Sequence, residues 1–450
     1  MQIPDEMLSA VDSSVDDLIS LHQSLVRIES VNTGVMPTGN ETAVCEFVQQ
    51  WLSEEGIDSE ILARDPNRGN IIANINGTSG QAGLMFMSHT DVVPVEDESK
   101  WSFPPFGATI SNGRIYGRGS NDCKGLLAAQ MMAMRLLKRT GVQLQDGLIL
   151  ASGADEEHGG RYGFEWLTEN YPEKLAAPLA VNEGGGEPIS SGSLTYLLGT
   201  GEKGRLQIEI NVKGTSAHAS VPWQGSNAMY RVAQVLQRIE AYQPELDTSS
   251  ELFNHLSTFA IEHKPSPDNI TEIISDMESV NPRFASVLRA LSRMTVTPTM
   301  VSGGIKSNSV PESVSITCDV RTLPHQDDQY VRTELAEALA GIPDVDFEID
   351  YMAVPNSSPF QTDFADRIRS VTERVLNREI KWVPMTSTGF TDSRFTRTLD
   401  TTTYGFAGSH PDDDPLLSNI HGTDESIGIN SLISSTKIML ALSYDVLASP

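Results

Sequence analysis

The sequence contains few cysteines and no long apolar run. Cys45, Cys123 and Cys318 are the only cysteines in 450 residues, and an odd, widely spaced set fits a reducing compartment better than a disulfide framework. No apolar stretch approaches the roughly 20 residues that a membrane-spanning helix needs. The first six residues, which include Asp5 and Glu6, lack the apolar segment of a signal peptide. We therefore expect a cytoplasmic protein that is neither exported nor inserted into a membrane.

Basic residues are scarce relative to acidic ones. The chain has 32 Lys and Arg residues against 60 Asp and Glu residues, which gives a formal net charge of −28. Nucleic acids and anionic membrane surfaces attract clustered Lys and Arg side chains. Neither is therefore an expected partner, and most of the charge is expected on the solvated surface, where it favours solubility.

The length and the spacing of apolar residues predict an α/β protein with two domains. A chain of 450 residues is too long for one ordinary hydrophobic core. In its first part, helical spacing alternates with short apolar runs of strand length, as in a mostly parallel sheet flanked by helices. Helices are expected at 15–30, after Asn40 and at 125–137, and strands at 70–75, 83–87 and 147–152.

The pattern changes near residue 200. Residues 206–212 alternate strictly between apolar and polar, which is typical of a strand with one solvated face. We expect it to be an edge strand that could pair across a twofold axis. Further strands are expected at 295–301, 314–320 and 346–352, helices at 228–239 and about 328–340, and an irregular or helical insertion at 244–293.

Two later helices, at 363–376 and 431–447, indicate that the chain returns to the first domain. We therefore expect a catalytic domain made of residues 1–200 and 355–450. The residues between them, 201–354, are expected to form an inserted, smaller α/β lid or dimerisation domain.

Histidine and carboxylate residues follow several of the expected strands. The strand at 83–87 leads to His89 and Asp91, and the strand at 147–152 leads to Asp155-Glu156-Glu157. Asp122 follows a glycine-rich turn, and Glu183 follows an apolar run at 179–181. His421 precedes the last expected helix. In open α/β sheets, ligands bind at the carboxyl edge of the strands. Each acidic residue alone is more often a simple turn residue.

Taken together, these side chains form a ligand set for two divalent cations. Imidazole and carboxylate groups suit Zn, Mn or Co, and two ions about 3.5–4 Å apart need a carboxylate that can bridge them. The adjacent Glu156 and Glu157 allow one glutamate to bind metal while the other stays free as a base.

Several motifs resemble those of the dinuclear zinc amidohydrolase and exopeptidase family. The segments Ser-His-Thr-Asp-Val-Val-Pro at 88–94, Gly-Arg-Gly-Ser-Asn-Asp-Cys-Lys-Gly at 117–125 and Asp-Glu-Glu at 155–157 carry the resemblance. It extends through 214–218, 308–311, 319–321 and 421–425, nearly the whole chain. Members of this family include carboxypeptidase G, aminoacylase, acetylornithine deacetylase, succinyl-diaminopimelate desuccinylase and carnosinase-like dipeptidases.

The resemblance implies how the metal ions are held. His89 and Glu183 would bind one ion, Glu157 and His421 would bind the other, and Asp122 would bridge both. The ions are expected to be zinc, with cobalt or manganese as alternatives. One departure lies beside the bridge, because Cys123 stands where Met or another residue is usual, and we expect it to be a small buried side chain.

The resemblance also implies catalytic and substrate-binding residues. Glu156 would be the general base, and Asp91 would fix the tautomer of His89 by a hydrogen bond. His218 would polarise the scissile carbonyl, reaching the metal ions of a partner subunit in a homodimer. The residues expected to contact the substrate are Asn308, Arg321, Gly389 and Thr391.

These observations predict metal-dependent hydrolysis of an amide bond in a peptide or N-acyl amino acid with a free carboxylate, held by Arg321. Carboxypeptidase, dipeptidase and deacylase activities remain open. At 201–204 the chain reads Gly-Glu-Lys-Gly where paired arginines would suit a dicarboxylate, which argues against a succinylated substrate. The alternative is a non-catalytic binding or scaffold protein on the same fold, but such a protein would not need Glu156.

Overall fold

The chain folds into two compact units. The structure, a computed structural model, describes residues 4–190 and 193–448. The first unit contains the described residues up to Thr200, Ser358–Met385 and those from Thr391 onward, and the second contains Gly201–Ser357 and Thr386–Phe390. The second unit thus runs three residues past the expected boundary at 354 and adds a short later segment. Within the described ranges, none of the helices has the length and apolar character required to cross a membrane.

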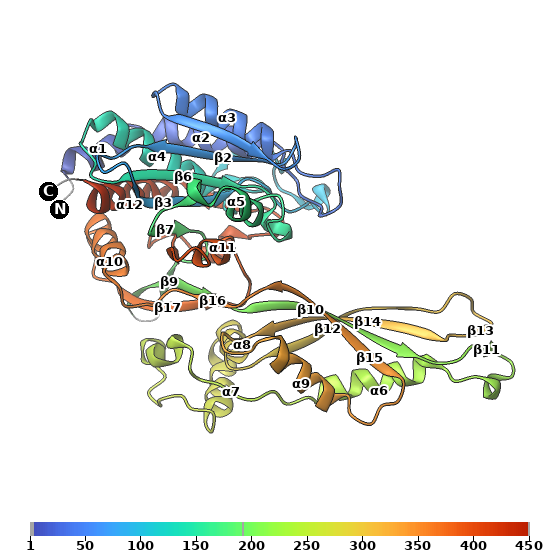
Figure 1. Ribbon diagram of the computed structural model, residues 1–450. Helices are drawn as coiled ribbons and strands as arrows, with labels where there is room; N and C mark the ends of the chain where they lie inside the picture. Colours follow the sequence, from blue (N-terminus) through green and yellow to red (C-terminus); the bar gives the residue numbers. More distant parts are fainter. Residues whose placement is uncertain (1–3, 191–192, 449–450) are drawn as a thin grey trace. The chain divides into compact units, whose positions relative to one another are not determined.

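A mixed sheet forms the centre of the first unit (Figure 1). Its middle strands run parallel: β6 pairs with β3, β3 with β7, and β7 with β18. Antiparallel strands extend both sides, with β2 and β1 beyond β6 and with β9 beyond β18. The bounds are β1 Asp58–Ala63, β2 Gly69–Ile75, β3 Ala82–His89, β6 Gly147–Gly153, β7 Leu179–Asn182, β9 Leu194–Glu202 and β18 Thr402–Gly405; β8 Pro188–Ser190 and β17 Lys381–Ser387 also pair with β9.

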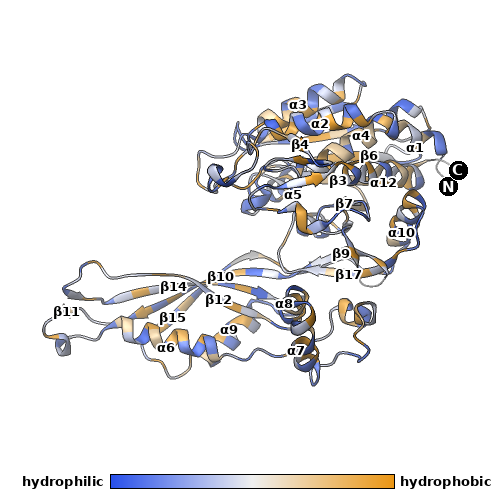
Figure 2. Ribbon diagram, turned by 180° about the vertical axis from the view of Figure 1, so that it is seen from behind, coloured by the Kyte–Doolittle hydropathy of each residue, from blue (hydrophilic) through white to orange (hydrophobic). Residues whose placement is uncertain are grey.

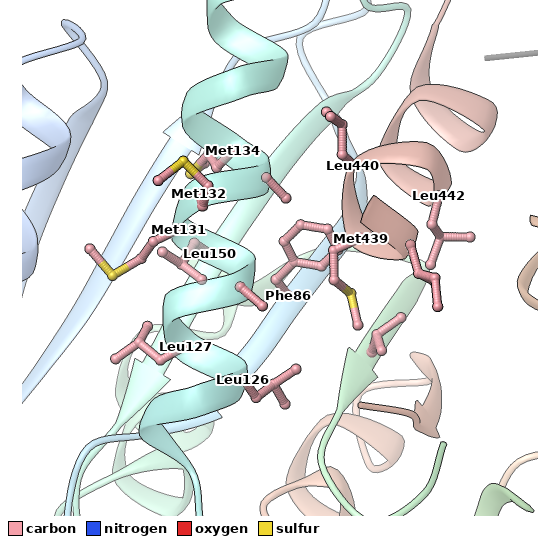
Figure 3. Close-up of a cluster of buried hydrophobic side chains, with 14 of the residues drawn as sticks. Phe86, Leu126, Leu127, Met131, Met132, Met134, Leu150, Met439, Leu440 and Leu442 are labelled. Carbon is pink, nitrogen blue, oxygen red and sulfur yellow. The ribbon is translucent and has the colours of Figure 1, made fainter. Parts of the chain in front are cut away.

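Both faces of the central strands of this sheet are buried. Alternate residues of a strand point to opposite faces, and in β3 Phe86 belongs to the main hydrophobic core while Met85 and Met87 belong to a second cluster with Phe164. Figure 3 shows Phe86 and Leu150 among side chains of α4 and α12. Because both faces are covered, the strands read as continuous apolar runs, which is why the sequence predicts them well.

The helices of the first unit bury apolar residues against the sheet or against neighbouring helices, and Figure 2 shows both hydrophilic and hydrophobic residues in this layer. The helix α4 (Lys124–Thr140) is the most enclosed, because every residue from Lys124 to Leu137 is buried. The other helices are α1 Asp5–Asp12, α2 Val15–Arg27, α3 Glu41–Ser53, α5 Phe164–Asn170, α10 Asp363–Leu376, α11 Ser393–Arg397 and α12 Ile429–Leu447.

A small antiparallel sheet in the same unit joins two distant parts of the chain. β5 (Arg114–Tyr116) pairs with β4 (Thr109–Ser111) on one side and with β19 (Ser426–Gly428) on the other. This pairing brings the glycine-rich turn that follows β5 next to the loop that precedes β19. The turn carries Asp122 and the loop carries His421.

The second unit is a four-stranded antiparallel sheet in the order β12-β14-β10-β15, with α6 and α9 packed on one face. The expectation of an edge strand at 206–212 is wrong, because β10 lies between β14 and β15. Its alternation reflects one face packed on helices and one solvated face, which a central strand also has. The bounds are β10 Gly204–Lys213, β12 Thr295–Gly303, β14 Ser313–Thr322, β15 Val345–Ala353, α6 Ala228–Ala241 and α9 Asp328–Ala338.

Helices fill most of the insertion expected at 244–293. They are the 3-10 helix Glu251–Phe259, α7 (Ile270–Val280) and α8 (Pro282–Leu291). A separate two-stranded ladder pairs β11 (Ala217–His218) with β13 (Ser309–Val310).

Candidate two-metal site

Three neighbouring parallel strands deliver acidic and imidazole side chains to one edge of the main sheet. β3 ends at His89, β7 ends one residue before Glu183, and β6 ends shortly before the 3-10 helix Glu156–His158. Because the strands run parallel in the order β6-β3-β7, their carboxyl ends meet at the same edge. This is the edge where open α/β sheets bind ligands.

A first group of possible metal ligands surrounds His89. The Nε2 atom of His89 lies 2.9 Å from Oδ1 of Asp122 and 3.5 Å from Oε2 of Glu183. The Cys123 sulfur joins them, and the potential ligand atoms of all four residues lie within 4.8 Å of one another. As expected, Cys123 is a buried side chain, at the start of α4.

A second group surrounds His421. Its Nε2 atom lies 3.0 Å from Oδ2 of Asp122 and 3.1 Å from Oε2 of Glu157. The two oxygens of Asp122 therefore face different histidines, one in each group. A carboxylate in this position is placed to bridge two cations.

The acid-base state of these side chains shows how strongly they interact. Hydrogen bonds to Asp122 and Glu157 raise the pKa of His421 to about 10. Burial raises the pKa of Glu157 to about 7, against the effect of its hydrogen bond from His421. Burial opposes a charge on His89, but Glu183 and Asp122 still raise its pKa well above the usual value. Metal binding would have to displace protons from these groups.

The residues present fit two divalent cations. The two histidines each direct Nε2 toward carboxylate oxygens, and imidazole nitrogen with carboxylate oxygen is a ligand set for Zn, Mn or Co. In addition, Oε1 of Glu157 is buried and has no hydrogen-bond partner. Such an atom is costly to bury unless another group satisfies it, and a cation held by this carboxylate would do so.

Asp91 forms hydrogen bonds with residues of both ligand groups. The Nδ1 atom of His89 lies 3.0 Å from the backbone oxygen of Asp91 and 3.4 Å from its carboxylate. Both are acceptors, so Nδ1 carries a proton, and Nε2 is the nitrogen that would bind a metal ion once it has lost its own proton. The expected hydrogen bond between Asp91 and His89 is thus made mainly by the backbone oxygen of Asp91. The carboxylate instead accepts the backbone N–H groups of Glu156 and Glu157.

Glu156 stands apart from both ligand groups although it is next to Glu157 in the chain. Its side chain is buried, and burial together with the nearby carboxylate of Glu183 raises its pKa well above the usual range. A carboxyl group with a raised pKa beside a metal site is suited to accept and return a proton.

The remaining predicted residues divide between the two units. Thr391 belongs to the first unit, where its hydroxyl accepts a hydrogen bond from Asn182, the residue before Glu183, at 3.3 Å. In the second unit, His218 pairs with Ser309 and lies beside Asn308, whose backbone oxygen accepts from Ala219 at 3.0 Å.

Arg321 and Gly389 also belong to the second unit. The Arg321 guanidinium donates to Asp319 at 2.7 Å and to the backbone oxygen of Thr388, next to Gly389, at 3.2 Å. Gly389 and Thr391, expected in one loop of the catalytic domain, therefore fall in different units.

Two supporting residues have no role in the sequence-based interpretation. Glu425 lies in the quoted motif at 421–425, and its carboxylate accepts the backbone N–H of Asp122 at 3.1 Å. Arg68 is buried and donates to Asp155, beside Glu156, at 2.9 Å. Only the motif around Glu425 offered a signal, and nothing in the local sequence marks Arg68.

The fold and the site together define a class: a metallohydrolase with a two-metal centre on an α/β sheet. The chain belongs to the family described as Peptidase family M20/M25/M40, whose sequence model matches residues 85–445. This confirms the family resemblance drawn from the motifs and the expected α/β fold with its mostly parallel central strands. Metal-dependent hydrolysis of an amide bond follows from this membership, and the non-catalytic alternative is disfavoured.

Curated relatives and solved structures agree with this assignment. Two Staphylococcus epidermidis proteins named "Probable succinyl-diaminopimelate desuccinylase" are 28% identical over 372 residues, covering 80% of each chain, and 30% identical over 329 residues, covering 71% of each. The M20 family metallo-carboxypeptidase Sso-CP2 from Sulfolobus solfataricus has a TM-score of 0.73 at 19% identity, covering 94% of this chain and 98% of that one. The dipeptidase Dug1p from Saccharomyces cerevisiae has a TM-score of 0.68 at 15% identity, covering 97% of each. These two structures share the fold.

Proposed function

We propose that the chain uses two zinc ions to hydrolyse the amide bond of an N-acyl amino acid or short peptide that carries a free carboxylate. The observation that carries this proposal is the shared carboxylate of Asp122, which faces His89 with one oxygen and His421 with the other. The proposed ligands are His89, Glu183 and Asp122 for one ion and His421, Glu157 and Asp122 for the other. Zinc suits both groups, with cobalt or manganese as substitutes.

The chain's own residues would then divide the chemistry. When bound, the two cations would polarise the amide carbonyl and acidify water. Glu156 takes a proton from the attacking water on its carboxylate and passes it to the nitrogen of the leaving amine. His218 donates a hydrogen bond to the developing oxyanion, and Arg321 holds the substrate carboxylate in a charge-assisted pair.

Lys203 bears on the choice of substrate. The relatives named as desuccinylases make a succinylated substrate a candidate, and a second carboxylate would need a second cation. Lys203 is fully buried, and its ammonium group already donates to the backbone oxygens of Ala290 at 2.6 Å and Arg293 at 2.8 Å. Burial lowers its pKa to about 7. These contacts favour a substrate with one carboxylate.

We also propose that the protein is a cytoplasmic homodimer that associates through the second unit. The cytoplasmic location is supported by free thiols at all three cysteines. The dimer is supported by the edge strand β12, which exposes Met300 and Val301, and by the exposed apolar residues Trp223, Tyr230 and Ile305. Exposed edges and apolar patches on a protein surface often mark an interface. His218 of one subunit would then act at the metal ions of its partner.

A substrate screen tests the proposed function. The purified chain is stripped with a chelator and reloaded with Zn, Co or Mn. It is then assayed on dipeptides, N-acetyl amino acids, N-succinyl amino acids and the carboxamide of each. We expect a divalent cation to restore hydrolysis of at least one compound with a free carboxylate, and not of its carboxamide. A fully loaded chain that hydrolyses none of these amides would contradict the proposal.

A further inference from the structure

We propose that Glu425 and Arg118 form a positioning pair that holds Asp122 and His421 in place for the second metal ion. The inference rests on the proposed function, because it takes Asp122, Glu157 and His421 as the ligands of that ion. Glu425 and Arg118 are both buried, so both would act through the ligands that they hold.

The carboxylate of Glu425 is committed to the turn that carries Asp122. Its Oε1 atom accepts the backbone N–H groups of Asn121 at 3.0 Å and Asp122 at 3.1 Å. Its Oε2 atom accepts the N–H of Gly119 at 3.1 Å and Nη1 of Arg118 at 2.6 Å. A carboxylate offers about four acceptor positions, so this group is saturated. It orders the turn and has no position left for a cation.

Arg118 extends the same network to the other ligand. While Nη1 binds Glu425, Nη2 donates to the backbone oxygen of His421 at 3.3 Å. A guanidinium can serve both partners at once because its donors form a rigid planar fork, whereas a lysine ammonium cannot span them in the same way. The ring of Trp101 lies 5.3 Å from the guanidinium carbon and helps to confine it.

His421 needs such an anchor more than His89 does. His89 ends a central strand, and Asp91 holds its ring from behind. His421 lies in a loop, its side chain is 52% exposed, and its φ of 61° is in the left-handed region. A residue other than glycine keeps this conformation only where its surroundings fix it. The loss of Glu425 or Arg118 should therefore loosen the second metal group more than the first, because the first shares only Asp122 with it and keeps His89 and Glu183 in place.

A neighbouring arginine provides a matched control. Arg114 is also buried and lies in β5, just before the turn that carries Arg118. Like Arg118, it binds the segment that precedes α12. It donates to the hydroxyl and backbone oxygen of Ser426 at 2.9 and 3.1 Å, and it pairs with Asp413. Within the described ranges, its hydrogen bonds reach none of the proposed metal ligands. Arg114→Lys therefore reports the structural cost of altering a buried arginine in this small sheet.

Metal titration of three variants tests the proposal. The metal-free wild type, Glu425→Gln, Arg118→Lys and Arg114→Lys are titrated with Zn²⁺ by calorimetry and with Co²⁺ by visible absorption. We expect Glu425→Gln and Arg118→Lys to bind the second equivalent about 10–100-fold more weakly, the usual effect of losing a residue that orients a ligand. The first equivalent should weaken less, because Asp122 is the only ligand that the two proposed groups share. The absorption of the second Co²⁺ equivalent should change, and Arg114→Lys should match the wild type.

The titrations also define the results that would overturn the proposed positioning pair. Wild-type affinity for the second equivalent in folded Glu425→Gln and Arg118→Lys would overturn the proposal, as would equal weakening of both equivalents. If Glu425→Gln does not fold, Arg118→Lys decides alone, because it keeps the positive charge beside Glu425. A wild type that takes up fewer than two ions would contradict the proposed function itself. That result is separate from failure of the positioning pair, which requires a two-ion wild type with unaffected variants.

Discussion

The backbone N–H of Glu156 donates to the carboxylate of Asp91 at 3.1 Å. The other oxygen of the same carboxylate accepts the N–H of Glu157 at 3.2 Å, and the backbone oxygen of Asp91 orients the ring of His89. One buried residue thus fixes the positions of the proposed base and of one proposed ligand from each metal group. Mutation of residues that orient metal ligands in this way typically costs about 10–100-fold in metal affinity or activity.

Asp91→Asn should therefore reduce turnover without removing the metal ions. An amide group can accept with its oxygen, but its NH₂ cannot accept a backbone N–H, so Glu156 or Glu157 loses its anchor. We expect kcat to fall by about 10–100-fold, while metal content measured by mass spectrometry stays at the wild-type level. Turnover close to that of the wild type would show that this anchoring is dispensable.

Arg321 can be tested together with its proposed partner on the substrate. Replacing the substrate carboxylate by a carboxamide should lower kcat/KM by the equivalent of about 2–5 kcal/mol, the usual cost of breaking one side of a charged pair. Arg321→Ala should cause a comparable loss with the free acid and little further loss with the carboxamide. Additive losses in the two changes would mean that Arg321 and the carboxylate do not meet.

His22 should make the metal-free protein sensitive to mild acid. It is buried and lies 2.8 Å from the backbone oxygen of Ser120, and burial lowers its pKa from 6.5 to about 4. An unfolded chain binds this proton below pH 6.5 and the folded chain does not, so folding stability falls as the pH drops from 6.5 toward 4.

The matching variant is His22→Gln, whose amide can still donate to Ser120 but does not titrate. Between pH 7.5 and pH 5 the wild type should lose about 2 kcal/mol more unfolding free energy than this variant. Denaturant unfolding of both chelator-treated proteins measures the difference. Parallel pH curves would contradict a neutral, buried His22.

The shared active site of the proposed dimer predicts complementation between two inactive variants. His218→Ala and Glu156→Ala are mixed under conditions that exchange subunits. Each mixed dimer then contains one site with both residues intact, so a fraction of wild-type activity should return. Exchange is followed by mass spectrometry of differently tagged chains. A mixture that exchanges fully and stays inactive would show that His218 acts within its own chain or has no catalytic role.

The residues that follow buried strands were predictable, because His89, Glu156 and Glu183 stand directly after apolar runs whose ends define one sheet edge. The role of Glu425 was not, because its partner Asn121 lies 304 positions away and no local pattern records that contact. The place of β10 within its sheet was mispredicted for a related reason. Alternation reports which faces are buried, whereas strand order depends on pairing with distant segments.

The central claim is that Glu156 is the base of a two-metal amide hydrolase, and Glu156→Gln tests it most directly. Bound metal and kcat are measured on the same preparation, with Glu157→Gln as the comparison. The account predicts two ions per chain for Glu156→Gln with kcat lowered by about 10²–10⁴-fold, and a reduced metal content for Glu157→Gln. Near-normal turnover of Glu156→Gln with both ions bound would contradict it.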